Sequence, residues 1–356
     1  MGSSRRDFLH NSGFGLMFLA AFLRSPRSVL GHLLFEPEGE LVPTKPVPPN
    51  PFTRNGKPLV ALVQGKDPGL ALHLAMSLLG GADRLQSRGK RVLLKPNVLN
   101  DRPPPTTTNP QVVRAMAELL RVQGAADVVV ADGSGIIRLP TSANLTATGM
   151  KAAADSVGAK VLALEDQAWV RLEPPQAKSL TRFFFSKPVY EADVVINMPV
   201  IKTHRFAEFS CSLKNLVGAV HPRNRPSVTF WSGDWHERIA ELNLAVHPLL
   251  TVADGTTIMV EGGPTSGTPA KLDVLLCSGD RVALDMVALA LLRSFGTWPK
   301  IQGKRIAEQR QIKRAVELGL GVSSAADIDL VSGAVDAAPP EFARLVERIR
   351  EDLGKS

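Results

Sequence analysis

Short apolar runs separated by amphipathic stretches occupy most of the chain from residue 59 to residue 335. Apolar runs bounded by turn residues indicate buried strands, which we predict at 59–64, 91–95, 127–132, 160–164, 193–198, 249–254, 272–278 and 328–331. Apolar residues at every third or fourth position indicate helices, which we predict at 69–79, 110–123, 145–157, 210–217, 236–246, 282–294, 301–318 and 340–353. Strands that are apolar throughout are buried on both faces. The pattern therefore predicts an α/β fold with mostly parallel sheets and helices on both faces, either as one body or as two closely associated lobes.

The predicted helix 110–123 has the clearest start in the sequence. Asn109 is a favourable N-cap and Pro110 fits the first helical position, while Gly124 ends the helix. Three threonines, Thr106–Thr108, run directly into it. The free N–H groups at such a helix start can bind an anion, but the threonines serve equally well as capping residues.

The remaining segments divide the chain into four parts. We predict a targeting segment at 1–31, a linker or strap at 32–58, an α/β domain at 59–335 and a C-terminal helix within 336–356. The strap is predicted because residues 36–58 contain seven prolines and little periodicity.

The first residues resemble a twin-arginine export signal. Arg5 and Arg6 precede an apolar stretch at 14–23, and Arg24 and Arg27 follow it. We therefore expect export by the twin-arginine translocation machinery to the periplasm or another extracytoplasmic space, with cleavage near Gly31. This route carries folded proteins, often with a cofactor already bound. The alternative is a disordered basic tail.

Composition narrows the classes of partner. The formal charge is +8. Residues 1–31 hold four Arg and one Asp, a net +3, which leaves +5 on the rest of the chain. This moderate excess, without a stacking motif or a basic helix, favours a small anionic ligand and indicates no nucleic-acid binding. No apolar run reaches the roughly 18 residues of a transmembrane helix. Two cysteines cannot hold a 4Fe–4S cluster, and whether Cys211 and Cys277 pair stays open.

Polar, Gly- or Pro-rich segments follow four of the predicted strands, at 95–97, 131–135, 197–204 and 252–267. Ligands of open parallel sheets bind beyond the carboxyl ends of the strands. We therefore expect these four segments to converge on one cleft.

The most cationic of these segments supplies the main candidates. Lys202 and His204 alternate by two and share a face, and Lys214 and Asn215 lie in a short predicted helix before Gly218. A desolvated Lys can act as a base or form an imine, and a His can move protons or bind a metal. Taken singly, each residue is more often an ordinary surface residue, but their density favours a functional site. Arg223 and Arg225 are expected at its rim.

Further candidates come from the other segments. Lys95 and Asn97 could present an ammonium and an amide to an anion, or Lys95 could simply extend to solvent at a strand end. Asp132 begins a flexible D-G-S-G loop. Glu261 in its Gly-rich turn is the acid most suited to act as a base, to bind a metal or to balance the lysines, and Asp285 could pair with a nearby cation. If a metal binds, the candidate ligands are His204, Glu261 and Asp285.

The segments "VLLKPNV", "TTTNPQVVRAMAELL", "ADVVINMPVIKTH", "CSLKNLVGAVHP" and "VADGTTIMVEGGPTSG" occur in an order that resembles the domain of unknown function 362 family over about residues 90–335. The resemblance implies no settled activity. The family's recurrent residues correspond here to Lys95, Asn97, Asp132, Lys202, His204, Lys214, Asn215, Gly218, Glu261 and Asp285. Some relatives carry a Cys-rich ferredoxin-like segment, which this chain lacks, so an iron–sulfur protein remains only as a redox partner. At fold level the layout also resembles the nickel-pincer lactate racemase family.

Two functions are consistent with these patterns. The first is an exported enzyme that binds a carboxylate- or phosphate-bearing small molecule, with Lys202, His204, Lys214 and Glu261 as catalytic residues. Lys95, Asn97, Asp132, Asn215 and Gly218 would bind the ligand. The second is a non-catalytic carrier of a metal or organic cofactor, or a redox partner of an iron–sulfur protein. The sequence names neither the reaction nor the cofactor.

Overall fold

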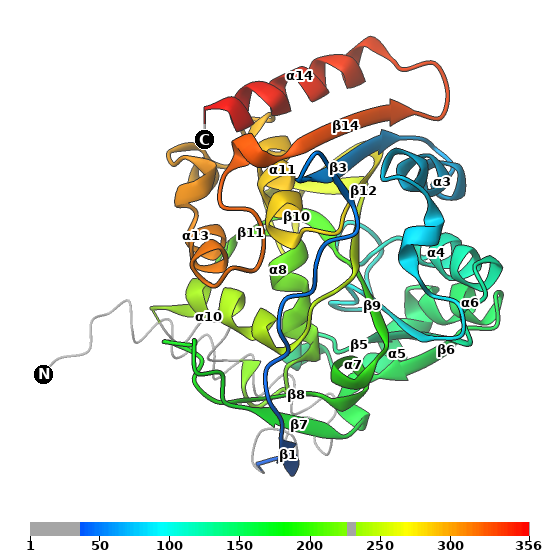
Figure 1. The fold of residues 1–356 in the computed structure, drawn as a ribbon, viewed down its shortest axis with the longest axis vertical. Coiled ribbons are helices and arrows are strands. Elements are labelled where there is room, and N and C mark those ends of the chain that lie inside the picture. Colours follow the sequence, from blue (N-terminus) through cyan, green and yellow to red (C-terminus); the bar gives the residue numbers. More distant parts are fainter. Residues whose placement is uncertain (1–35, 226–232, 356) are drawn as a thin grey trace, which may run out of the picture.

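The computed structural model describes residues 36–225 and 233–355 (Figure 1). The predicted export signal at 1–31 lies outside these residues.

Two sheets form the frame of the fold in the described residues. A large sheet has the strand order β14-β3-β13-β12-β9-β4-β5-β6, with β10, β11 and β2 attached beside this path, and a small sheet has the order β1-β7-β8. The strands are β1 Gly39–Leu41, β2 Thr53–Arg54, β3 Lys57–Gln64, β4 Arg91–Pro96, β5 Asp127–Asp132, β6 Lys160–Ala163, β7 Trp169–Leu172, β8 Phe183–Ser186, β9 Val194–Met198, β10 Val200–His204, β11 Glu208–Ser210, β12 Leu250–Gly262, β13 Gly267–Ser278 and β14 Asp329–Ala334.

The prediction of an α/β fold is confirmed, and that of a mostly parallel sheet is confirmed in part. Strands β9, β4, β5 and β6 are parallel to their neighbours, and β12 is parallel to both β9 and β10. Strand β13 runs antiparallel to both β12 and β3. Strands β12 and β13 form a long hairpin, in which Gly262 and Gly263 take φ angles of 82° and 78° that residues with a Cβ atom rarely adopt. Most of residues 252–267, expected as a loop, are therefore strand.

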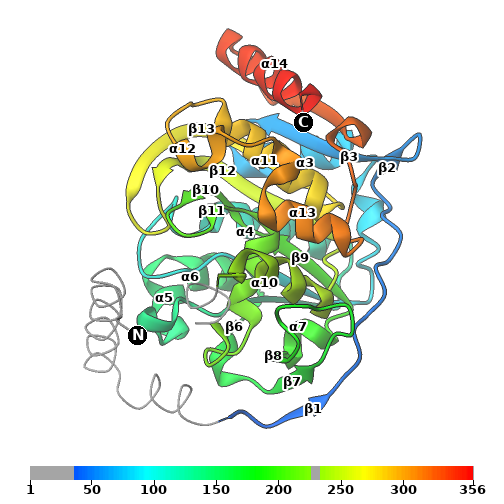
Figure 2. The same ribbon diagram turned by 90° about the vertical axis from the view of Figure 1, so that its left-hand side faces the viewer.

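The helices lie on both faces of the large sheet (Figures 1 and 2). Helices α3, α4 and α6 share one apolar core with one face, and α8, α10, α11, α13 and α14 share a second core with the other. The helices are α3 Pro68–Leu78, α4 Pro110–Val122, α5 Thr141–Ala147, α6 Met150–Asp155, α7 Lys187–Glu191, α8 Ser212–Asn215, α10 Trp235–Glu241, α11 Arg281–Arg293, α12 Pro299–Gln302, α13 Arg310–Glu317 and α14 Pro340–Gly354.

The two cores follow from the alternation of side chains along each strand. On β3, Val60 and Leu62 belong to one core while Ala61 and Val63 belong to the other. Every strand that separates two helical layers must be apolar on both sides, which explains the continuous apolar runs in the sequence.

Helix α4 confirms its predicted start, since the Asn109 side chain accepts a hydrogen bond from the Gln111 N–H at 3.0 Å. Two predicted helices are each broken in the structure. The one at 145–157 becomes α5 and α6, because Gly149 takes a left-handed φ of 76°. The one at 301–318 becomes α12 and α13, which short turns separate.

The proline-rich segment runs along the outside of the domain (Figure 1). Strand β1 pairs with β7, the Lys45 carbonyl lies 2.8 Å from His247 Nε2, and the Phe52 side chain is fully buried.

The predicted domain boundaries stay predictions. None of the helices in the described residues combines the length and hydropathy that crossing a bilayer requires. Cys211 and Cys277 are both buried as free thiols.

A buried carboxylate joins three elements on the α11 side of the sheet. Glu241 is fully buried at the end of α10, and it accepts hydrogen bonds from the N–H groups of residues 178–180 at 2.6–2.9 Å. It also binds the guanidinium of Arg314 on α13 at 2.7 Å. All the acceptor capacity of the carboxylate is therefore used within the fold.

We predict that Glu241→Gln lowers the free energy of unfolding by about 2–4 kcal/mol. The amide leaves the Arg314 guanidinium without its buried counter-charge, and its own NH₂ group faces N–H donors that need an acceptor. Urea denaturation measures the change. The matched control is Glu317→Gln, which removes the other carboxylate bound to Arg314. Glu317 is partly exposed, and its variant should change stability by less than about 1 kcal/mol. Equal losses in the two variants would contradict the assignment.

Candidate functional site

A cleft of about 440 Å³ lies beyond the carboxyl ends of the strands. Its walls come from all four polar segments singled out in the sequence, so their predicted convergence is confirmed. The lining residues are Asn97, Leu99, Asp132–Arg138, Lys202, His204–Phe206, Ser210, Lys214, Asn215, Val217, Gly218, Arg225 and Gly263–Thr265.

A buried ion pair joins the first two strand ends. Lys95 Nζ at the end of β4 lies 2.5 Å from Asp132 Oδ1 at the end of β5, and Asp132 Oδ2 accepts the Val98 N–H at 2.6 Å. Both side chains are buried. Burial lowers the pKa of Lys95, and the nearby Asp132 carboxylate opposes this change. Lys95 therefore serves as the partner of Asp132, and Asp132 holds the loop that follows β4.

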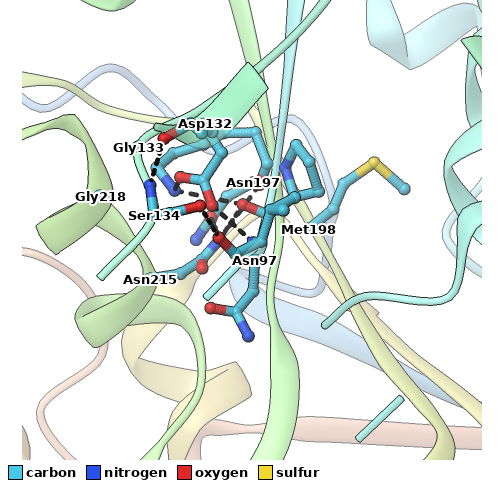
Figure 3. A network of polar contacts seen from close by, with 12 residues as sticks. Asn97, Asp132, Gly133, Ser134, Asn197, Met198, Asn215 and Gly218 are labelled. Carbon is cyan, nitrogen blue, oxygen red and sulfur yellow. Dashed lines mark hydrogen bonds and ion pairs between the residues drawn. The ribbon is translucent and has the colours of Figure 1, made fainter. Parts of the chain in front are cut away.

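Gly218 is essential to the packing around this pair (Figure 3). A Cβ atom added to Gly218 would lie 2.3 Å from Asp132 Oδ1 and 2.9 Å from Lys95 Nζ. Its backbone borders the cleft, but the close approach to the ion pair is what requires glycine at this position.

Amide side chains tie the short helix α8 to the strand ends (Figure 3). Asn215 Nδ2 donates to the Lys95 carbonyl at 3.0 Å and to Asn197 Oδ1 at 2.8 Å. Asn197 Nδ2 donates in turn to the Ser212 carbonyl at 3.0 Å. Asn97 lines the cleft nearby, and its Nδ2 donates to the Thr106 carbonyl at 2.9 Å. Asn197 and Asn215 thus hold α8, which also carries Lys214, against the strand ends.

Lys202 and Lys214 bring two ammonium groups to the cleft. Lys202 on β10 is 2% exposed, and its Nζ donates to the Thr106 carbonyl at 3.1 Å. Burial, together with the charge of Lys214, lowers the pKa of Lys202 to about 7. Burial, together with the charge of Lys95, lowers the pKa of Lys214 to about 8. Within the described residues, neither lysine has a carboxylate at ion-pair distance.

The hydrogen bonds of His204 define its tautomer. His204 Nδ1 accepts the N–H groups of Phe206 and Ala207 at 3.2 and 3.0 Å, so the proton of the neutral ring lies on Nε2. Burial and the charges of Lys214 and Lys202 lower the pKa of His204 well below its usual value. At neutral pH the ring is therefore neutral with an N–H donor at Nε2, and its predicted role in moving protons stays a prediction.

Arg225 lies within the site, although the sequence placed it at the rim. It is 3% exposed, and its guanidinium donates to the carbonyls of Val220, Gly218 and Gly133 at 2.7, 2.9 and 3.3 Å and also to that of Ser134. The rim prediction is wrong for Arg225, because the glycine-rich D-G-S-G loop lets the guanidinium reach its backbone carbonyls. That loop composition was the available signal.

The predicted acids have different positions. Glu261 is exposed on the β12–β13 hairpin, accepts a hydrogen bond from Thr268 Oγ1 at 3.2 Å and does not line the cleft. Asp285 on α11 accepts the N–H groups of Ser212 and Leu213 at 2.6 and 3.0 Å, and so holds the start of α8. Burial raises the pKa of Asp285 to about 7.

The metal-ligand candidates do not form a coordination set. His204 lines the cleft, Glu261 is exposed and Asp285 is buried beneath α8. Across residues 36–225 and 233–355, no three His, Cys, Asp or Glu side chains gather as a metal site requires. The donors of the described residues therefore do not form a metal centre in this cleft.

The threonines before α4 make hydrogen bonds that hold the loop preceding the helix. Thr108 Oγ1 donates to the Met198 carbonyl at 2.8 Å, and Thr106 Oγ1 donates to the Pro103 carbonyl at 2.7 Å. The Asn109 N–H is bound by Asp254 Oδ2 at 2.6 Å. The cap of α4 is Asn109, and both alternatives left open for the threonines, capping and anion binding, stay predictions.

Sequence reasoning missed an apolar wall of the cleft. Its side chains are Leu99, Ile136, Ile137, Phe206 and Pro264. Phe206 is 47% exposed, which is unusual for a large apolar residue and suggests contact with a ligand. The signal in the sequence was the pair Ile136-Ile137 directly after a flexible loop.

Comparison with known proteins identifies related sequences. Residues 92–290 match the family described as "Domain of unknown function (DUF362)". The "Thylakoid-associated protein sll1697" of Synechocystis sp. (strain ATCC 27184 / PCC 6803 / Kazusa) is 28% identical over 250 residues, which cover 63% of this chain and 69% of that protein. All the predicted site residues, from Lys95 to Asp285, lie within the family match.

We predict that Asp132→Asn lowers the free energy of unfolding by about 3–5 kcal/mol at neutral pH, because Lys95 then lacks its buried counter-charge. Lys95 would be neutral in the folded variant and protonated in the unfolded one, so the variant should regain stability as pH rises toward 10.5. The control on the same strand is Asp127→Asn, whose partner Lys160 is exposed. Its loss should stay below about 1 kcal/mol.

A second prediction concerns the pH dependence that Lys202 imposes. Its folded pKa of about 7 is below its usual 10.5, so between these values the unfolded chain binds more protons and stability rises with pH. The Lys202→Met variant has no titrating amine at this position, so it lacks this contribution to the pH dependence of stability. The variant should exceed the wild type in unfolding free energy most strongly below pH 7, and the difference should shrink toward pH 10.5. Urea titrations at several pH values measure it, with the exposed Lys66→Met as control. A pH-independent difference would contradict the assignment.

Proposed function

Because the chain belongs to the DUF362 family, whose description states no activity, we propose from the cleft that it is an enzyme acting on a small anionic molecule that carries a carboxylate or a phosphate. One observation carries the proposal. Lys202 and Lys214 face a single cleft without a carboxylate partner in the described residues, while the one acid that lines the cleft, Asp132, already binds Lys95. A buried cation without a counter-charge is costly, and an anionic ligand offsets that cost.

The residues have distinct roles in this proposal. Lys214 anchors the anion, and Lys202, partly neutral near pH 7, acts as a base or a nucleophile. His204 donates its Nε2–H to an oxygen on which negative charge develops. Asn97 and Asn215 hold the lysines and the loop in place, and the apolar wall receives the rest of the molecule. Glu261, exposed on its hairpin, has no step in this scheme.

Export is proposed on the sequence alone. The paired arginines at 5 and 6 and the apolar stretch at 14–23 support transport by the twin-arginine machinery. The relative's name associates that protein with the thylakoid, which supports a site of action at or beyond a membrane. The fold-level analogy to lactate racemases is compatible with a hydroxy- or oxo-acid ligand, but no step here depends on nickel.

A non-catalytic carrier is the second candidate, because the same cationic cleft would retain an anionic organic cofactor. The purified full-length protein should be denatured, and the released metals and small molecules measured by mass spectrometry. A stoichiometric ligand that survives purification and is not converted would favour the carrier. An empty cleft that binds added acids reversibly would favour the enzyme.

We predict that the cleft binds 3-phenylpropanoate and phenyl phosphate more tightly below pH 7 than above pH 8, since Lys202 and Lys214 lose their charge across that interval. Lys214→Met should weaken binding roughly ten- to hundredfold, because a hydrogen bond to a charged group contributes about 1.5–3 kcal/mol. Isothermal titration calorimetry measures both effects. Lys66→Met, on the surface, should bind like the wild type. Binding that is insensitive to pH and to Lys214 would refute the proposed function.

A further inference from the structure

Lys202 differs from an ordinary lysine in its surroundings. Its Nζ contacts a backbone carbonyl, that of Thr106, and has no carboxylate within ion-pair distance in the described chain. The side chain is 2% exposed, yet it borders the cleft, so a ligand can reach the amine while bulk water scarcely does. Desolvation beside a second cation is the arrangement that makes a lysine amine nucleophilic.

The fraction of Lys202 that is a neutral amine is large at neutral pH. With its pKa near 7, about half of Lys202 is the neutral amine at that pH. A lysine with the usual pKa of 10.5 is neutral in roughly one molecule in three thousand. Lys202 can therefore attack a carbonyl carbon under conditions in which surface lysines remain almost entirely protonated.

The neighbours of Lys202 define the ligand that such an amine would meet. Lys202 on β10 and Lys214 on α8 line the same cleft of about 440 Å³, so one small molecule can present a carbonyl to Lys202 and an anionic group to Lys214. The apolar wall of Leu99, Ile136, Ile137, Phe206 and Pro264 fits a third, apolar part. A carbonyl next to a carboxylate, with an apolar substituent, is a 2-oxo acid.

We propose that Lys202 forms an imine with the carbonyl carbon of a 2-oxo acid that carries an apolar side chain, while the carboxylate of the acid binds Lys214. This inference rests on the anion-binding function proposed above and names its substrate class.

The step balances without any further reactant. The neutral Nζ attacks the carbonyl carbon, a C–N bond forms, and the C=O π electrons move to oxygen. One Nζ proton transfers to this oxygen to give a carbinolamine. The hydroxyl then leaves with the second Nζ proton as water, and a C=N bond remains. His204, with its proton on Nε2, donates a hydrogen bond to the oxygen while it carries negative charge.

The experiment traps the imine on the full-length protein. Phenylpyruvate and sodium cyanoborohydride are added at neutral pH, and peptides are mapped by mass spectrometry. We expect Lys202 to gain the mass of the acid less water plus two hydrogens. Pyruvate, which lacks the apolar part, should label Lys202 more slowly, and 3-phenylpropanoate, which lacks the carbonyl, should not label it. Labelling at this position should be abolished in Lys202→Arg, which keeps the charge, and unchanged in Lys66→Met.

Separate outcomes test the imine and the anion site. Label spread over exposed lysines, and equally abundant in wild type and Lys202→Arg, would overturn the inference. If calorimetry shows Lys214-dependent binding of 3-phenylpropanoate but phenylpyruvate leaves Lys202 unlabelled, the imine is wrong and the anion-binding function stands. If none of these acids binds the wild type, both proposals fail. Mapping in the wild type keeps the test valid even if a Lys202 variant folds poorly.

Discussion

The buried pair of Lys95 and Asp132 is the interaction on which the rest of the cleft depends. One oxygen of Asp132 binds the ammonium group at the end of β4, and the other binds the Val98 N–H in the loop that follows. A single carboxylate therefore fixes two strand ends and one loop. Taking two charges out of water is expensive unless their remaining hydrogen-bonding capacity is satisfied. The absence of a side chain at Gly218 lets the chain after α8 approach close enough to enclose the pair.

The same pair determines the electrostatics of the cleft. Asp132 forms its ion pair with Lys95, and its charge, like that of Asp254, only partly opposes the effect of burial on the pKa of Lys202. The nearby buried acid Asp254 is also engaged, since its oxygens accept hydrogen bonds from Asn109 and Thr256. Lys202 and Lys214 thus have no carboxylate at ion-pair distance within the described residues, and burial lowers the pKa values of both lysines. The cleft therefore combines two lysines with an apolar wall in one small volume.

Local patterns in the sequence predicted the parts of the site that depend on strand ends and on side-chain periodicity. Asn97 and Asp132 line the cleft, and Lys95 is buried against Asp132, because parallel strands end at a common edge. Lys202 and His204 both line it because residues two apart on a strand share a face. Contacts between residues far apart in the sequence could not be predicted from such local patterns. The β12–β13 hairpin carries Glu261 outward, Arg225 folds back beneath the D-G-S-G loop, and backbone N–H groups fix the His204 tautomer. None of these has a signature in residue spacing.

The cost of this arrangement is itself an argument about function. Lys202, buried without an ion-pair partner in the described residues, lowers the stability of the folded chain across neutral pH, and an apolar residue at this position would avoid that cost. Sites that break the local rules of stable packing in this way are usually sites where a ligand completes the structure. A ligand that needed only positive charge would be served by two ordinary, fully protonated lysines at the rim. Burial instead leaves one amine partly neutral beside a cation, and this combination suits a molecule in which an anionic group and an electrophilic carbon are neighbours.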